Sequence, residues 1–94
     1  MTALLALTRN PSLRIMLQLV AAPRRYNELL DALPECTEPA VGAYLRELDS
    51  DGLAQRRVDP GPPLRVLYEL TPLGLEIAPS LGAIESWASR TDQA

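Results

Sequence analysis

The spacing of apolar residues changes period along this chain, and that change constrains the fold more than any other feature. Up to Leu48, apolar residues recur at intervals of three and four, as on a helix with one buried face. Between Ala54 and Leu70 they fall into two short runs separated by Asp-Pro-Gly-Pro-Pro, a pattern typical of a β-hairpin with a stiff tip. The helical spacing returns after Thr71. The sequence therefore predicts helices, one hairpin and a closing helix.

Three helices are expected before the hairpin, over about 12–21, 26–33 and 37–51. Thr37 is a good N-cap for the third, because its hydroxyl accepts from N–H groups that lack an intrahelical partner, and Gly52 ends that helix in a left-handed conformation. The helices would bury their apolar stripes in one shared core. The expected stripes are Leu13, Met16, Leu17 and Val20, then Tyr26, Leu29, Leu30 and Leu33, then Val41, Tyr44, Leu45 and Leu48.

Two further apolar segments flank this core, a short helix at about 3–8 and the closing helix at about 72–90. The closing helix is apolar on two sides, and in a chain of 94 residues such a helix needs a partner surface, most simply a second copy of the chain. We therefore expect one domain over residues 1–94, with the two terminal helices forming the dimer interface. The expected interface residues are Leu4, Leu7, Leu81, Ile84 and Trp87. The alternative is a ligand pocket in that interface, lined by Leu4, Leu7, Leu81 and Trp87.

The composition excludes several classes of function. All nine cations are arginine and there is no histidine, which excludes His-based acid–base catalysis, His-ligated metals and Schiff-base lysines. A single cysteine cannot form an internal disulfide. No nucleophile–base pair falls in a predicted cleft, so we expect no enzyme, no cofactor and no metal. Without a long apolar span or a basic leader, we expect a cytoplasmic protein with no membrane partner.

The order of the elements predicts a fold. A mainly α chain with one small hairpin, ordered short helix, helix, short β segment, two helices, strand, wing, strand and closing helix, is a winged helix-turn-helix. In this fold the second helix of the turn, here about 37–51, enters the major groove of DNA. The wing, here about 56–66, touches the backbone or the minor groove. The sequence therefore predicts a DNA-binding regulator.

Several segments also resemble one family of regulators. They are PRRYNEL at 23–29, LP at 33–34, YLREL at 44–48, DGL at 51–53, PLRVLYELTPLG at 63–74, and Trp87. These segments resemble the HxlR-type transcriptional regulators, relatives of the MarR group, and the resemblance covers about 12–88. The segment 10–14 is closer to the ArsR group. The resemblance implies a dimeric bacterial repressor or activator that reads a pseudo-palindromic operator in double-stranded DNA.

The resemblance also assigns candidate DNA contacts. Arg24 matches a basic residue at the start of the first helix of the helix-turn-helix. Thr37 matches the hydroxyl N-cap of the second helix, about 37–51, which is called the recognition helix. Arg46 matches a basic residue on that helix, and Arg65 matches the wing arginine. With Arg56 and Arg57 on the hairpin, these arginines would form an electrostatic footprint for phosphate. The alternative is that the hairpin arginines are solvated, because neighbouring residues of a strand point to opposite sides.

The segment that should read bases is the unusual part of the chain. Between residues 31 and 55 there are six acids and one arginine, although the whole chain carries a net charge of only −3. Where the family presents polar or basic residues in the middle of the recognition helix, this chain has Gly42, Ala43 and Tyr44. Base contact would fall to Thr37, Tyr44 and Arg46, with Ala43 touching a thymine methyl. Tyr44 also lies on the apolar stripe, so a core position is its alternative.

Two alternatives follow from this segment. The first is functional: a winged-helix protein that has lost DNA binding and acts as a protein-interaction or small-ligand-binding module. A small-molecule effector is also compatible with the leading hypothesis. The second concerns Cys36, just before the N-cap of the recognition helix, which is either a redox-active thiol or a partly buried residue of the turn.

Overall fold

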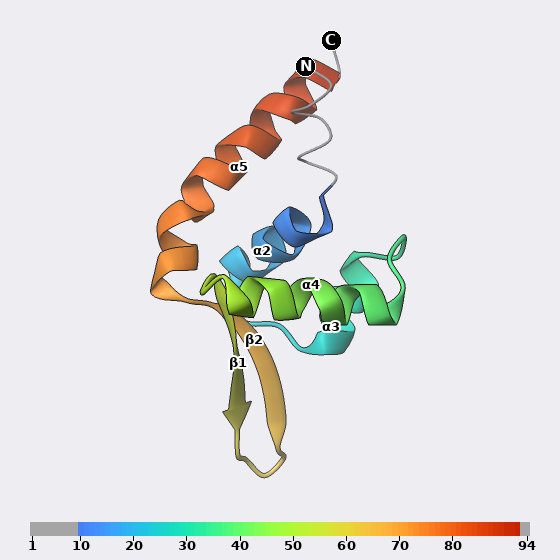
Figure 1. The fold of residues 1–94 in the computed structure, drawn as a ribbon, viewed down its shortest axis with the longest axis vertical. Helices are drawn as coiled ribbons and strands as arrows, with labels where there is room; N and C mark the ends of the chain where they lie inside the picture. Colours follow the sequence, from blue (N-terminus) through green and yellow to red (C-terminus); the bar gives the residue numbers. More distant parts are fainter. Residues whose placement is uncertain (1–9, 93–94) are drawn as a thin grey trace.

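The computed structural model describes residues 10–92 and contains the expected order of elements (Figure 1). The described residues form four helices and one antiparallel hairpin, as in a winged helix-turn-helix. The expected helix at about 3–8, with Leu4 and Leu7, lies outside the described residues. The elements are α2 (Pro11–Ala21), α3 (Tyr26–Ala32), α4 (Glu38–Ser50), β1 (Ala54–Asp59), β2 (Arg65–Leu70) and α5 (Pro72–Asp92).

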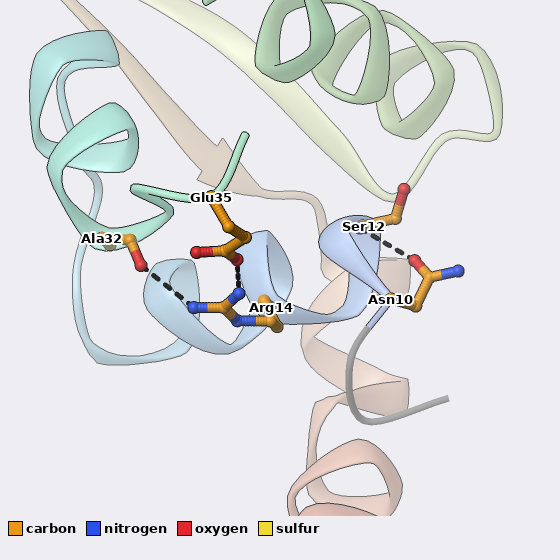
Figure 2. A network of polar contacts seen from close by, with 5 residues as sticks. All are labelled: Asn10, Ser12, Arg14, Ala32 and Glu35. Atoms are coloured by element: carbon orange, nitrogen blue, oxygen red, sulfur yellow. Dashed lines mark hydrogen bonds and ion pairs between the residues drawn. The ribbon is translucent and has the colours of Figure 1, made fainter. Parts of the chain in front are cut away.

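Helix α2 forms as expected, but it buries a different stripe. Its N-cap is Asn10, whose Oδ1 accepts from the N–H of Ser12 at 2.9 Å (Figure 2). The expected stripe is wrong in part: Val20 is 46% exposed, while Ile15 and Leu19 are buried. Because α2 lies in the middle of the protein and contacts α4, α5 and β2, its buried surface is wider than the narrow stripe of a helix packed on one side.

The helix-turn-helix unit, α3 and α4, is held by polar contacts at the turn. The hydroxyl of Thr37 accepts from the N–H of Ala40 at 3.3 Å, which confirms the predicted N-cap. The hydroxyl of Tyr26 on α3 donates to the carbonyl of Glu38 at 2.6 Å. The first bond satisfies an N–H of the first turn of α4, and the second joins α3 to the start of α4.

Arg14 joins α2 to the same turn (Figure 2). One terminal nitrogen donates to the carbonyl of Ala32 at 3.2 Å, and the other forms an ion pair with Glu35. One of the six acids of the 31–55 segment is therefore paired within the fold.

The hairpin pairs Ala54 with Leu70 at its base and Asp59 with Arg65 near its tip, one residue longer on β1 than expected. The predicted short β segment is an isolated bridge, in which the N–H of Arg24 donates to the carbonyl of Tyr68 at 2.9 Å. The bridge anchors the base of the hairpin to the chain before α3. The distal part of the hairpin projects from the helical body (Figure 1).

Helix α5 begins against the end of α4 and then runs outward (Figure 1). The Thr71 hydroxyl caps it, accepting from the N–H of Gly74 at 3.1 Å and donating to the carbonyl of Gly52 at 2.6 Å. Gly52 has a φ of 75°, which confirms the left-handed end predicted for α4. On the first turns of α5, Leu73 and Leu75 are exposed.

The core lies where α2, α3 and α4 meet the base of the hairpin and the first half of α5. The members with no exposed surface are Ile15, Leu29, Leu33 and Val41. Within residues 10–92, no helix is both long enough and apolar enough to cross a membrane.

Candidate nucleic-acid interface

Helix α4 has one face in the core and one face in solvent. Val41, Leu45 and Leu48 are buried. With 100° between successive residues of a helix, the four positions farthest from these three are all exposed. They are Pro39, Ala43, Arg46 and Ser50. Of the predicted contact residues on α4, Ala43 and Arg46 therefore lie on the outward face.

The two other predicted contacts at α4 have different surroundings. Thr37 is exposed, and its hydroxyl oxygen is the N-cap acceptor. Tyr44 is half-buried and packs against the core on the side of α4 that faces α2 and α5. This placement favours the core alternative for Tyr44 over base reading.

The three hairpin arginines do not share one face. Side chains alternate along a strand, and the register pairs Arg56 with Tyr68 and Arg57 with Leu67. Arg56 therefore points toward α4, whereas Arg57 and Arg65 belong to the opposite face. Arg57 forms a 3.1 Å ion pair with Glu69. The side chain of Arg65 is exposed.

Arg24 contributes to the fold itself. It is half-buried, its Nε donates to the carbonyl of Gln18 at 3.2 Å, and its backbone makes the bridge to Tyr68. The expected footprint of arginines is thus divided between the bridge before α3, the two faces of the wing and α4.

A hollow of about 240 Å³ lies between α4 and the wing; we call it the α4–wing hollow. Two arginines, two tyrosines and one acid line it, with Gly42 in its wall. The tyrosine rings are 6.4 Å apart, centroid to centroid. The residues that matter here are Tyr26, Gly42, Arg46, Asp49, Arg56 and Tyr68.

The hydroxyl of Tyr26 is electrostatically perturbed at this hollow. Partial burial raises its pKa, and the neighbouring Glu38 and Tyr68 raise it further. Arg46 acts in the opposite direction and lowers the Tyr26 pKa, since a cation favours the phenolate. The hydroxyl is therefore protonated at neutral pH, and it donates its proton to the carbonyl of Glu38.

A second hollow, of about 570 Å³, lies on the other side of α4; we call it the α5 hollow. It is mainly apolar, with two acids, Glu47 and Asp51, among its lining residues. The predicted interface residues Leu81 and Ile84 line it, and both are half-buried. Its apolar lining comes mainly from α2, α4 and α5: Leu13, Met16, Tyr44, Leu48, Ile77, Leu81 and Ile84.

The remaining candidates are also half-buried. Cys36 packs beside the core at the turn before α4, as one of its two alternatives expects. Trp87 lies on the outer half of α5.

The sequence was also compared with protein families. The model of the HxlR-like helix-turn-helix family matches residues 7–94. The chain belongs to the HxlR-like family. This confirms the resemblance seen in the sequence, and it confirms a regulator of transcription with a helix-turn-helix fold in place of an enzyme.

Among curated relatives of this HxlR-like chain, the transcriptional regulator YvaP of Bacillus subtilis is 37% identical over 75 residues, which are 80% of this chain and 69% of YvaP. The regulator sll1512 of Synechocystis is 40% identical over 78 residues, 83% of this chain and 58% of sll1512. The chain thus spans between about half and about two thirds of the length of these relatives.

Solved structures agree on the HxlR-like fold. The redox regulator HypR in its reduced form superposes with a TM-score of 0.75 at 27% identity, covering 82% of this chain and 76% of HypR. A MarR-family regulator from Enterococcus faecalis gives a TM-score of 0.69 at 33% identity, covering 83% and 71% of the two chains. The likeness extends across most of the described residues.

Sequence reasoning missed several residues of the α4–wing hollow. Tyr26 appeared only on an apolar stripe and in a family-like segment, Tyr68 only in the second strand and in such a segment, and Asp49 only as one of several acids. The register of the hairpin places Tyr68 opposite Arg56, and this pairing could have identified Tyr68 as a neighbour of Arg56. The closeness of Tyr26 to Arg46 depends on the crossing of α3 and α4, which no local pattern encodes.

Proposed function

We propose that this HxlR-like regulator is a homodimer that binds a pseudo-palindromic operator in double-stranded DNA. Helix α4 enters the major groove, and the wing contacts the backbone or the minor groove. Such a regulator acts beside the chromosome, which places it in the cytoplasm, and a small-molecule effector is compatible with this role.

One observation carries the proposal: α4 and the projecting hairpin lie next to each other (Figure 1), and both carry exposed arginine. Pro39, Ala43 and Ser50 are small enough to let the helix approach base edges closely, with Ala43 suited to a thymine methyl. Arg46, Arg56 and Arg65 supply positive charge for phosphate. We propose that Thr37 contacts DNA at the first turn of α4. Arg57 would add positive charge at the wing, and Arg24 would add it at the base of the wing.

The proposed dimer uses α5. This helix runs outward from the body and keeps half-buried apolar residues, Ile84 and Trp87, beyond the point where the core ends. A two-fold axis through α5 would present two α4 helices to successive turns of the major groove. The proposed interface also includes Leu81 and the residues Leu4 and Leu7.

The test is fluorescence anisotropy with labelled duplexes from the region upstream of the protein's own gene, titrated with the full chain at rising salt. Binding should weaken with a steep log–log slope, because several counterions leave the DNA. A scrambled duplex of equal length is the control for specificity. Absence of binding at low salt would refute DNA recognition, and light scattering that shows a monomer at micromolar concentration would refute the dimer.

A second candidate function is favoured by the acids on α4. Glu38, Glu47 and Asp49 are exposed on the same helix as Arg46, and none of them forms an ion pair among the described residues. A domain that no longer binds DNA would use this surface for a basic protein partner. Binding of no DNA, together with stoichiometric capture of one protein that Glu47→Arg abolishes, would favour this candidate.

A further inference from the structure

The α4–wing hollow brings two arginines and two tyrosines from different elements close together. Arg46 comes from α4 and Arg56 from β1, and both line the hollow. Neither guanidinium forms an ion pair within residues 10–92. Tyr26 and Tyr68 line the same space, and their rings tilt toward each other at 59°. Two arginines and two tyrosines therefore line one small cavity.

Gly42 keeps this cavity open. A Cβ at residue 42 would lie 3.4 Å from the Nη1 of Arg46 and 3.4 Å from the hydroxyl oxygen of Tyr26. The guanidinium of Arg46 thus folds back along α4 toward Tyr26, across a position without a side chain. Any larger residue there would occupy the space between the cation and the hydroxyl. Glycine in the middle of a helix lowers the free energy of unfolding by about 1 kcal/mol relative to alanine. The open space beside Gly42 therefore comes with a loss of stability.

We propose that the α4–wing hollow is a phosphate site, which holds one phosphodiester of the DNA backbone between Arg46 and Arg56. The proposal rests on the proposed function and deepens it by naming which atoms of DNA this site takes. A guanidinium offers paired N–H donors that match phosphate oxygens. The hydroxyl of Tyr26 already donates to the carbonyl of Glu38, so the two guanidinium groups supply the donors for the phosphate. In this assignment Arg46 positions the helix on the backbone and does not read a base.

The acids beside the hollow, Asp49 and Glu38, set where the phosphate lies. Asp49 is almost one turn beyond Arg46, at the end of α4 near the start of β1, while Tyr26 and Gly42 lie at the other end. The carboxylate of Glu38 lies near Tyr26 at that other end. A phosphate avoids both carboxylates, so it lies between the guanidinium groups of Arg46 and Arg56. Base reading is then left to the rest of the outward face of α4, mainly Ala43 and its neighbours.

The experiment measures binding of the full chain to a labelled duplex of mixed sequence, because binding without sequence preference depends on phosphate contacts. The variants are Arg46→Gln, Arg56→Gln and the double variant. Two arginines on one phosphate are not independent, so the double variant should lower the salt slope by about 0.9 per protomer, where two separate phosphates would lower it by about 1.8. Each single substitution leaves the other arginine on the phosphate and should change the slope little. Arg65→Gln is the control for a separate contact, because it should lower the slope by about 0.9 on its own, and Arg90→Gln on α5 controls for loss of charge alone.

A steric variant tests the cavity with both charges kept. Gly42→Leu fills the space between Arg46 and Tyr26 and should weaken duplex binding about tenfold, the loss of one strong charge-assisted contact. Circular dichroism verifies that it folds. Gly42→Ala, whose Cβ makes only ordinary contacts, should fold and bind with a smaller loss. The proposal would be overturned if Arg46→Gln and Arg56→Gln each lowered the salt slope and the two decreases added in the double variant. It would also be overturned if the Gly42→Leu variant bound duplex as tightly as the unmodified chain.

A second readout separates DNA phosphate from a free anion. Inorganic phosphate, titrated at constant ionic strength, should shift the NMR amide signal of Gly42 only weakly, and less when Arg46 is glutamine. Suppose that free phosphate saturates the hollow and that the salt slope of duplex binding is the same with and without Arg46 and Arg56. The site then binds a small anion, and the assignment to DNA is wrong. If the unmodified chain binds no duplex, the proposed function itself fails; if it binds and the variants behave like it, only the phosphate site fails.

Discussion

The two hollows beside α4 differ in chemistry although one helix lines both. The α4–wing hollow is small and polar, with Arg46 and Asp49 from α4 and Arg56 from the wing. The α5 hollow has more than twice the volume and is lined mainly by aliphatic side chains, with Glu47 and Asp51 among its lining residues. A helix of thirteen residues thus divides its circumference among core, a polar cavity and an apolar one.

This difference teaches how a chain of this size can combine two kinds of contact. A polar cavity with cations suits a charged partner such as a phosphate backbone. An apolar cavity continued by the outer half of α5 suits burial against another apolar surface.

The largest expected effect comes from separating α5 from α4. In Gly74→Ala, the new Cβ would lie 2.2 Å from the carbonyl oxygen of Leu53, the same oxygen that accepts the N–H of Thr71. We expect a loss of about 2–3 kcal/mol in the free energy of unfolding, measured by urea denaturation. Gly82→Ala on the same helix is the control, because a Cβ there has open space, and it should stabilise by about 0.5–1 kcal/mol. Equal effects of the two substitutions would show that α5 does not depend on this close approach.

The second largest effect is expected from a substitution on the apolar flank of α5. Ile84→Glu places a carboxylate on the half-buried flank of α5, where the proposed dimer forms. We expect light scattering to show a monomer and operator affinity to fall by at least about tenfold, because the two half-sites are then bound separately. Ser86→Glu adds the same charge to an exposed position of α5 and should remain dimeric. A dimeric Ile84→Glu variant would move the interface elsewhere.

Tyr26 tests the polar side through stability. Tyr26→Phe removes the hydrogen bond to the carbonyl of Glu38 and should cost about 1 kcal/mol in urea denaturation at neutral pH. The raised pKa of Tyr26 means that the folded state favours the protonated hydroxyl. This contribution is therefore complete below the ordinary tyrosine pKa of about 10 and is lost as the pH rises through the higher pKa of the folded state. The difference between the two proteins should shrink at strongly alkaline pH, and a constant difference would contradict this account.

The smallest expected effect compares two acids of α4. Asp49→Asn removes a negative charge from the α4–wing hollow, and Glu47→Gln removes one from the α5 hollow. We expect Asp49→Asn to tighten binding to a mixed-sequence duplex by about threefold, since an exposed charge contributes less than about 1 kcal/mol, with a smaller change for Glu47→Gln. Anisotropy at low salt measures both. A larger gain from Glu47→Gln would reverse the roles of the two hollows.

Most of the fold could be predicted from the sequence, because its signals are local. The N-cap at Thr37, the left-handed Gly52 and the Pro-rich tip of the hairpin all act within a few residues of chain. The buried stripe of α2 was predicted less well. Ile15 and Leu19 are buried because α2 has neighbours on several sides, and the number of neighbours is a property of the assembled fold.

The candidate site was predictable only as a set of residue types. Arginines near the turn and on the hairpin were visible in the sequence, but their directions were not. Arg57 is paired with Glu69, Arg24 bonds to the carbonyl of Gln18, and Arg56 faces α4. The alternation along β1 predicted that Arg56 and Arg57 diverge, whereas the meeting of Arg56 with Arg46 required the relative position of the wing and α4.

The sequence by itself determined the order and type of the elements, the family and the local caps, since periodicity and capping act over one or two turns of chain. Tertiary structure decided which charges meet. It placed Glu35 against Arg14, set Tyr26 beside Arg46 across Gly42, and divided the circumference of α4 between a polar and an apolar hollow. The physical reason is that these contacts join residues distant in sequence, and their geometry depends on how helices and hairpin pack around a common core.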